Sequence, residues 1–201
     1  MCGGCVRLCA ALIVLFTLVL PQRLLATTVL SQSFPDLVHK AEVIAVGTVT
    51  GINNHWDAAR RAPFTVVTFS NLNVLKGTTQ GDTLSLYFLG GITPKGHTIS
   101  VHGVPRFSIG EKSIVFCAGN QRNFSPLVGV WQGRLRIAFD AQRQVETVQD
   151  NFHAPILGVQ NGQFLKKTPG SPTLQQQPVS LSSFLQLIQN ELGKELGKDN
   201  D

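Results

Sequence analysis

The sequence predicts a mainly β fold, a small antiparallel barrel or sandwich with a short helix at its start and an amphipathic helix at its end. Short runs rich in β-branched and aromatic residues recur between glycine-containing turns, and no long helical segment separates them. Apolar residues recur at helical spacing only in a short segment over residues 31–41 and in the last segment. We expect a β domain over residues 27–150, a loop or linker over 151–179, and a helix with its tail over 180–201.

Residues 1–26 have the layout of a secretory signal peptide. Arg7 precedes an apolar run over residues 10–20, and Pro21 ends this run before small residues follow. The run has about 11 residues, whereas a membrane-spanning helix needs about 20. We therefore predict an exported protein, either periplasmic or secreted.

The favoured cleavage point lies between Ala26 and Thr27, after the small residues that follow the apolar run. The alternative is an uncleaved signal anchor, which would be the protein's only attachment to a membrane. Pro21 and Arg23 argue against the anchor, because they lie where a longer span would continue.

The cysteines give little functional information. Cys2, Cys5 and Cys9 precede the end of the apolar run, which is not where a lipid-modified cysteine stands, and we assign them no function. After cleavage only Cys117 remains. One cysteine cannot form an internal disulfide, so the mature chain must be stabilised by its core.

The net charge does not indicate a nucleic-acid partner. The chain has 17 basic and 12 acidic residues, and removing Arg7 and Arg23 with the signal peptide leaves 15 against 12, a net charge of +3. No basic run with interleaved aromatic residues is present. We therefore expect no nucleic acid among the partners.

The first two elements differ in their periodicity. The segment SQSFPDLVHKA, residues 31–41, places apolar residues at helical spacing and predicts a short helix that starts near Pro35. The segment EVIAVGTVTGI, residues 42–52, is apolar at both odd and even positions. This pattern predicts a strand that is buried on both faces.

The next strand changes phase along its length. In FTVVTFSNLNVLKG, Val67 and Phe69 share one parity, whereas Leu72 and Val74 share the other. A β-bulge produces such a change, because one extra residue moves the following side chains to the opposite face. We therefore predict a bulged, bent strand.

Four further strands complete the predicted β domain. They lie in DTLSLYFLGG (82–91), HTISVHG (97–103), KSIVFCAG (112–119) and LVGVWQGRLRIAFD (127–140). Alternation predicts that some side chains face inward and two arginines face outward. The inward set is Leu84, Leu86, Phe88, Ile99, Val101, Leu135, Ile137 and Phe139, and the outward pair is Arg134 and Arg136.

The C-terminal part combines a linker with a helix. KKTPGSPTLQQQP, residues 166–178, has the composition of a linker. Ser180 then provides an N-cap for an amphipathic helix. We expect this helix to pack on the β domain, with docking on a partner as the alternative. Its apolar face consists of Leu181, Phe184, Leu185, Ile188 and Leu192.

The stretch 97–117 contains residue types that bind metals and perform catalysis. His97 and His102 stand five positions apart, so a continuous strand would direct them to opposite faces. Glu111 follows a glycine in a turn, where its carboxylate can accept hydrogen bonds from loop amides. Cys117 lies in an apolar strand and is interpreted as a packing residue. We interpret the stretch as scaffold.

The sequence contains no nucleophile-elbow, HExxH, CxxC or phosphate-loop motif. We therefore predict no catalytic residue, no metal site and no cofactor. A hydrolase that uses Glu111 or Cys117 is the remaining enzymatic alternative.

The segment NNHWDAARR, residues 53–61, is the candidate binding site. It joins the first two strands and contains His55, Trp56, Arg60 and Arg61. Loops on a rigid β scaffold often carry binding residues, and Trp and Arg often anchor interfaces. The alternative is a solvated hairpin loop with one partly buried tryptophan.

Several motifs resemble a group of exported bacterial domains. They are AEVIAVGTVTGI, TVVTFSNLNVLKG, DTLSLYFLGG, GVPRFSIGEKSIVF and VGVWQGRLRI, and the resemblance covers about residues 34–140. Some such domains accompany secreted zinc proteases of the matrixin kind. The strand pattern is also similar to the netrin-type barrel of the tissue inhibitors of metalloproteinases. The resemblance implies an OB-like, netrin-type-like barrel.

The inhibitory chemistry of those animal proteins has no counterpart among these residues. They place an amino-terminal cysteine over the protease zinc and are held by disulfides, whereas this mature chain would begin near Thr27 with one cysteine. We expect an exported, non-enzymatic module that binds an envelope or secreted protein, with a metalloprotease as one candidate partner. The main alternative is a periplasmic carrier of a small apolar or saccharide ligand.

Overall fold

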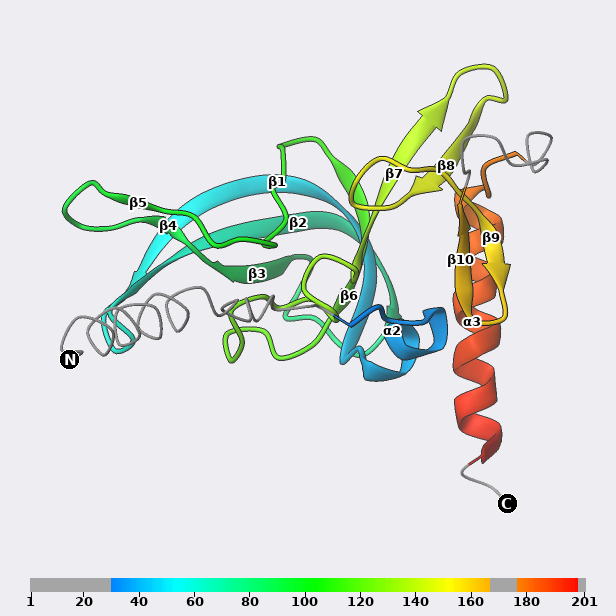
Figure 1. The fold of residues 1–201 in the computed structure, drawn as a ribbon, viewed down its shortest axis with the longest axis horizontal. Helices are drawn as coiled ribbons and strands as arrows, with labels where there is room; N and C mark the ends of the chain where they lie inside the picture. Colours follow the sequence, from blue (N-terminus) through cyan, green and yellow to red (C-terminus); the bar gives the residue numbers. More distant parts are fainter. Residues whose placement is uncertain (1–29, 167–176, 199–201) are drawn as a thin grey trace, which may run out of the picture.

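The computed structural model describes residues 30–166 and 177–198. The predicted signal peptide, its cleavage point between Ala26 and Thr27, and the three N-terminal cysteines lie outside these ranges and stay predictions. The described chain is mainly β structure with a helix near each end (Figure 1). Within these ranges, no helix combines the length and apolarity needed to span a membrane.

One antiparallel sheet of six strands organises the molecule, in the order β3-β2-β1-β6-β7-β8. The predicted mainly β class, the antiparallel pairing and the two helices are confirmed. The sheet differs from the prediction in not closing into a barrel, because β3 and β8 remain its edges. The strands are β1 (Val43–Asp57), β2 (Ala62–Lys76), β3 (Leu84–Leu89), β6 (Lys112–Cys117), β7 (Arg134–Asp140) and β8 (Val145–Gln149).

Neighbouring segments bond to both edges of the sheet, and this explains why it stays open. The side-chain amide of Asn120 bonds to the backbone of β3 as a neighbouring strand would. The Tyr87 N–H donates to Oδ1 of Asn120 (3.1 Å), and Nδ2 of Asn120 donates to the Ser85 carbonyl (2.8 Å). On β8, the Val148 N–H donates to the Val179 carbonyl at 3.2 Å. Backbone groups that barrel closure would need are therefore already used.

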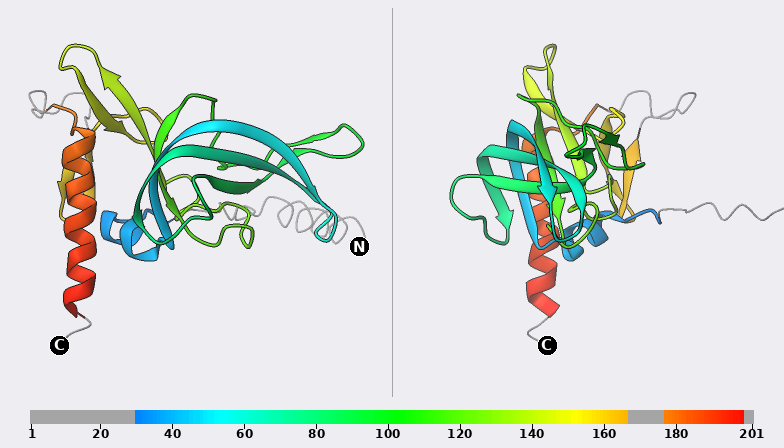
Figure 2. Two further views of the ribbon diagram at one scale, coloured as in Figure 1. Left: turned by 180° about the vertical axis from the view of Figure 1, so that it is seen from behind. Right: turned by 90° about the vertical axis from the view of Figure 1, so that its left-hand side faces the viewer.

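The predicted bulge in β2 is confirmed. Val46 pairs with Asn73 and Thr48 pairs with Ser70, so β2 has one more residue than β1 across this interval. Asn71, inside the interval, has a φ of +53°. The extra residue changes the side-chain phase and contributes to the bend of β1 and β2 that Figures 1 and 2 show.

The two faces of the sheet contribute to separate apolar clusters. The prediction of a strand buried on both faces is confirmed for the first half of β1, whereas residues 50–57 are exposed or half-buried. The alternation of β3 is confirmed, and the continuous apolar strand β6 is buried on both faces. One cluster lies between the sheet and the helices and includes Ile44, Val46, Ile114, Phe116 and Leu135. The other fills the inside of the curved sheet and includes Ala45, Val49, Val67, Phe69, Leu86, Phe88, Val115 and Cys117.

Three side-chain directions differ from the predictions. Arg134 was expected to face outward, but it is only 1% exposed, because residues 105–111 cover it and supply acceptors. Phe139 was expected inward, but it is 62% exposed, because β6 pairs with β7 only near Arg134 and leaves the distal part uncovered. Ile99, also expected inward, is 44% exposed.

Two small hairpins flank the main sheet. β4 (Gly91–Ile92) pairs with β5 (Thr98–Ile99), and β9 (Ile156–Gln160) pairs with β10 (Gln163–Lys166). The second hairpin lies within 151–179, which the sequence predicts as a loop or linker. Its strands are short and separated by a glycine turn, so they lack a clear alternating pattern. Residues 167–176 of the predicted linker lie outside the described residues.

The predicted N-terminal helix is α2 (Phe34–Lys40), and a capping box starts it. The Asp36 N–H donates to the Ser33 hydroxyl, and the Ser33 N–H donates to the Asp36 carboxylate. The hydrogen bond from Ser33, together with Lys40, lowers the pKa of the Asp36 carboxyl to about 2. The helix therefore begins with satisfied backbone donors.

The predicted C-terminal helix is α3 (Leu181–Lys198), and it packs on the β domain as expected. Ser180 caps it, because its hydroxyl accepts a hydrogen bond from the Ser183 N–H at 3.2 Å. Phe184 is fully buried and meets the ring of Phe34 edge-on at 5.7 Å. Figures 1 and 2 show α3 at the opposite end of the molecule from the β4–β5 hairpin.

Candidate functional site

The stretch 97–117 provides no catalytic or metal-binding cluster in the described structure. No group of three or more His, Cys, Asp or Glu residues in the described ranges could hold a metal ion. His97 and His102 are exposed. Burial raises the pKa of the Cys117 thiol far above its usual range, so this thiol stays protonated and serves as core.

Glu111 is a structural carboxylate. It accepts a hydrogen bond from the Ser108 N–H at 3.1 Å, as the turn predicts. It also forms ion pairs with Arg134 and, at 3.0 Å, with Arg136. With its oxygens held in this way, Glu111 stabilises the turn before β6 and is a poor candidate for a general base.

Arg134 is the most deeply buried charged residue among those described. Besides Glu111, its Nη1 donates to the Arg106 carbonyl (2.7 Å) and to Oδ1 of Asn151 (3.1 Å), and its guanidinium lies 4.1 Å from the ring centre of Phe107. Burial lowers its pKa, while the charge of Glu111 acts in the opposite direction. Arg134 therefore fastens residues 105–111 to β7.

A groove lies between the curved sheet and residues 90–107, which we call the strap. Its volume is about 470 Å³, within the range of about 300–1,000 Å³ that is typical of small-molecule sites. Most of its lining is apolar. The sheet contributes Ile52, Thr65, Val67, Phe88 and Leu89, and the strap contributes Gly90, Gly91, Thr98, Ile99, Ser100, Val101, Val104, Pro105, Arg106 and Phe107.

The strap is anchored where it leaves the sheet. The Ile92 N–H donates to Oδ1 of Asn54 (2.6 Å), and Nδ2 of Asn54 donates to the Ile92 carbonyl (2.8 Å). The Gly90 N–H donates to the Pro63 carbonyl. Gly91 has a φ of +141°, and a Cβ atom there would lie 2.4 Å from Oδ1 of Asn54. Only glycine allows this close approach.

Aromatic contacts anchor the other end of the strap. Phe107 meets the ring of Phe69 edge-on at 5.6 Å and lies 5.2 Å from the ring of Phe88. Between the two anchors, Ile99 on the strap and Ile52 on β1 are 44% and 37% exposed at the groove. The groove is therefore bounded by fixed segments but open to solvent.

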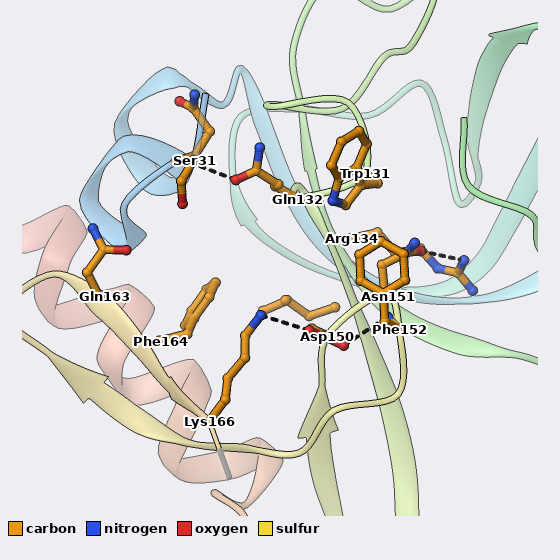
Figure 3. Close-up of a pocket in the computed structure, with 12 residues that line it drawn as sticks. Ser31, Trp131, Gln132, Arg134, Asp150, Asn151, Phe152, Gln163, Phe164 and Lys166 are labelled. Atoms are coloured by element: carbon orange, nitrogen blue, oxygen red, sulfur yellow. Dashed lines mark hydrogen bonds and ion pairs between the residues drawn. The ribbon is translucent and has the colours of Figure 1, made fainter. Parts of the chain in front are cut away.

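A second hollow of about 300 Å³ lies on the other side of Arg134 (Figure 3). Trp131, Phe152 and Phe164 give it aromatic walls. Trp131 is half-buried and meets the ring of Phe152 edge-on at 6.3 Å.

The main polar groups of this second hollow are already bonded within the protein. The Asp150 carboxylate accepts hydrogen bonds from the Phe152 and Ala154 N–H groups and pairs with Lys166 at 2.8 Å. Oε1 of Gln132 accepts a hydrogen bond from the Gln32 N–H. A ligand would have to compete with these bonds, so this hollow is the weaker candidate.

The predicted binding segment 53–61 is largely strand. β1 continues to Asp57 and β2 starts at Ala62, so only four residues form the turn. Two of the four candidates have intramolecular contacts: His55 meets the Tyr87 ring at 5.8 Å, and Arg60 pairs with Asp57 and bonds to the Gln121 carbonyl. The other two are less engaged. Trp56 is 36% exposed, and Arg61 is exposed in the turn.

The sequence did not reveal the groove, because its lining combines residues that lie far apart in the chain and alternate with buried ones. The strand predicted over 97–103 also concealed the strap, because the structure forms only the two residues of β5 there.

No protein-family model, curated protein or solved structure gives a significant match to the chain. The resemblance to exported bacterial domains and to netrin-type barrels stays a prediction.

We predict that Glu111→Gln lowers the free energy of unfolding by about 3–5 kcal/mol, because it leaves the buried Arg134 without its closest carboxylate. Glu146→Gln is the matched control, since Glu146 pairs with Lys112 at 2.7 Å in a more exposed position. The control should cost less than about 1 kcal/mol. Urea unfolding followed by circular dichroism measures both values, and equal losses would contradict the structural role of Glu111.

Proposed function

We propose that this protein is an exported, non-enzymatic binding module that takes a small apolar ligand into the groove beneath the strap. The observation that carries the proposal is the groove itself, about 470 Å³ in volume, mostly apolar, and bounded by a strap that is anchored at both ends. Of the two functions expected from the sequence, the proposal prefers the ligand carrier to the protein-binding module.

Partly exposed apolar side chains at the groove support a ligand of this kind. Ile52 and Ile99 expose apolar surface at the groove, and Val67 and Phe88 lie in its lining. Covering apolar surface contributes about 25 cal/mol per Å². An apolar ligand would therefore bind through the same effect that forms the core, with little rearrangement of the sheet.

The composition of the groove supports binding over catalysis. No His, Asp, Glu or Cys is among its lining residues, so the hydroxyl of Ser100 has no general base beside it there. The two residues of the hydrolase alternative are also occupied elsewhere, since Glu111 holds arginines and Cys117 is buried in the core.

Ile99→Asp tests the groove. The substitution removes apolar surface that a ligand would cover and adds a charge, so we expect the affinity for the neutral dye N-phenyl-1-naphthylamine to fall at least about tenfold, which corresponds to roughly 1.4 kcal/mol. Dye fluorescence measures the affinity. The matched control is Ile92→Asp, because Ile92 lies on the same hairpin, is 51% exposed and does not line the groove. Equal losses in both variants, or no dye binding by the wild type, would contradict the proposal.

Export is the part of the proposal that rests on residues 1–26 alone. Protein recovered from outside the cytoplasm of its host should begin at Thr27 when its N-terminus is sequenced. A chain that keeps residue 1 and stays in the cytoplasm would rule out the signal peptide.

A second candidate function is the binding of a secreted or envelope protein at the β1–β2 turn. Trp56 is half-exposed near this turn, and no described residue pairs with the neighbouring Arg61 guanidinium. Exposed Trp and Arg are the residue types that most often anchor protein interfaces. Figure 1 shows this turn far from α3, where a partner would not disturb the helix packing.

The turn is tested by affinity capture from envelope and culture-supernatant extracts. We expect Trp56→Ala to reduce the recovery of a specifically retained protein at least several-fold. Anchor residues often contribute about 2 kcal/mol or more to the binding free energy of an interface. Phe139→Ala is the control, because Phe139 is an exposed aromatic residue near the end of β7. Unchanged recovery with Trp56→Ala would exclude the turn as the docking site.

A further inference from the structure

We propose that the ligand of the groove is an anionic amphiphile, a single acyl chain with a carboxylate head, and that Arg106 binds this head. The inference rests on the proposed function and specifies its ligand class. It follows from the positive charge of the groove. This charge has no partner among the described residues, whereas most other described arginines are paired or hydrogen-bonded.

Arg106 is the only residue with an ionisable side chain in the groove lining. It is exposed, and no described residue forms an ion pair with its guanidinium or accepts a hydrogen bond from it. Among the described arginines only Arg61 shares this property. The others are engaged: Arg60 with Asp57, Arg122 with Glu42, Arg134 and Arg136 with Glu111, and Arg143 with the Pro178 carbonyl.

The charges behind Arg106 strengthen the preference for an anion. The Arg106 carbonyl accepts a hydrogen bond from Arg134, and Arg136 lies on the same strand as Arg134. Glu111 is the carboxylate that pairs with both. Arg134 and Arg136 therefore share one carboxylate, and the unpaired guanidinium of Arg106 adds to an excess of positive charge near this part of the groove. An anionic head would be attracted there, and a cationic head would be repelled.

The position of Arg106 fits an amphiphile better than a fully apolar ligand. A guanidinium exposed to solvent can form a bidentate pair with a carboxylate without the cost of burying either charge. The acyl chain would then lie along the apolar lining, which includes Val67, Phe88 and Phe107. A neutral apolar ligand would make no use of the Arg106 charge.

Competition with N-phenyl-1-naphthylamine tests the inference with the full mature protein. Dodecanoate and dodecan-1-ol, which have the same chain length, are each titrated as competitors at a pH where the carboxylate is ionised and at concentrations below micelle formation. We expect the wild type to bind dodecanoate at least about tenfold more tightly than dodecan-1-ol, because a charge-assisted pair adds to a shared apolar contribution.

Arg106→Gln should remove this preference, so that its affinity for dodecanoate falls to the level of its affinity for dodecan-1-ol. Arg106→Lys should retain part of it, since the positive charge remains. The matched control is Arg61→Gln, which removes an unpaired arginine at the β1–β2 turn, outside the groove, and should keep the full preference.

The outcomes separate this inference from the proposed function. If the dye binds and the two competitors displace it equally, or if the preference survives Arg106→Gln, the inference is overturned while the apolar site stands. If neither the dye nor either competitor binds the wild type, the proposed function fails and the inference fails with it.

Discussion

A buried ion pair between Arg134 and Glu111 holds together the parts of the molecule that form the groove. Arg134 belongs to β7, whereas Glu111 stands just before β6, and the Arg106 carbonyl and the Phe107 ring also contact the same guanidinium. Taking these charges out of water is costly, and the additional hydrogen bonds offset that cost. The backbone adds a further link, because the Val49 N–H donates to the Glu111 carbonyl at 2.9 Å. The end of the strap is therefore fixed against the sheet.

The same guanidinium separates two hollows that differ in their use of polar groups. On one side Arg134 bonds to Asn151, in the hollow of Figure 3, where the Asp150 carboxylate is already engaged by backbone amides and Lys166. On the other side it supports the groove, where Arg106 keeps its guanidinium unpaired in the described structure. The hollow of Figure 3 satisfies its charges within the protein. The groove presents a charge that a ligand can neutralise, and for this reason we assign the proposed function to the groove.

Local patterns in the sequence predicted five of the six strands of the main sheet, because alternation and phase depend on neighbouring residues. The alternation of β3 and the bulge near Asn71 are examples. The patterns missed β8, and the strand predicted over 97–103 is only the two-residue β5, outside this sheet. The direction of Arg134 was wrong, since alternation assigns a side chain to a face but says nothing of what covers that face. The prediction of a closed barrel was wrong for a similar reason, because alternation does not show that the Asn120 amide bonds to one edge of the sheet. The groove was missed, since Ile52 and Ile99 come to line one groove only in the folded chain. All four predicted binding residues are exposed, but His55 contacts Tyr87 and Arg60 pairs with Asp57.

Amide chemical shifts of the isotopically labelled protein test most directly whether the anchored strap creates a binding groove for an anionic amphiphile. The protein would be titrated with dodecanoate while the shift of each backbone amide is followed. We predict saturable changes concentrated in the strap, residues 90–107, and in the facing parts of β2 and β3. Changes confined to residues 131–166, around the hollow of Figure 3, or the absence of any saturable change, would contradict the account.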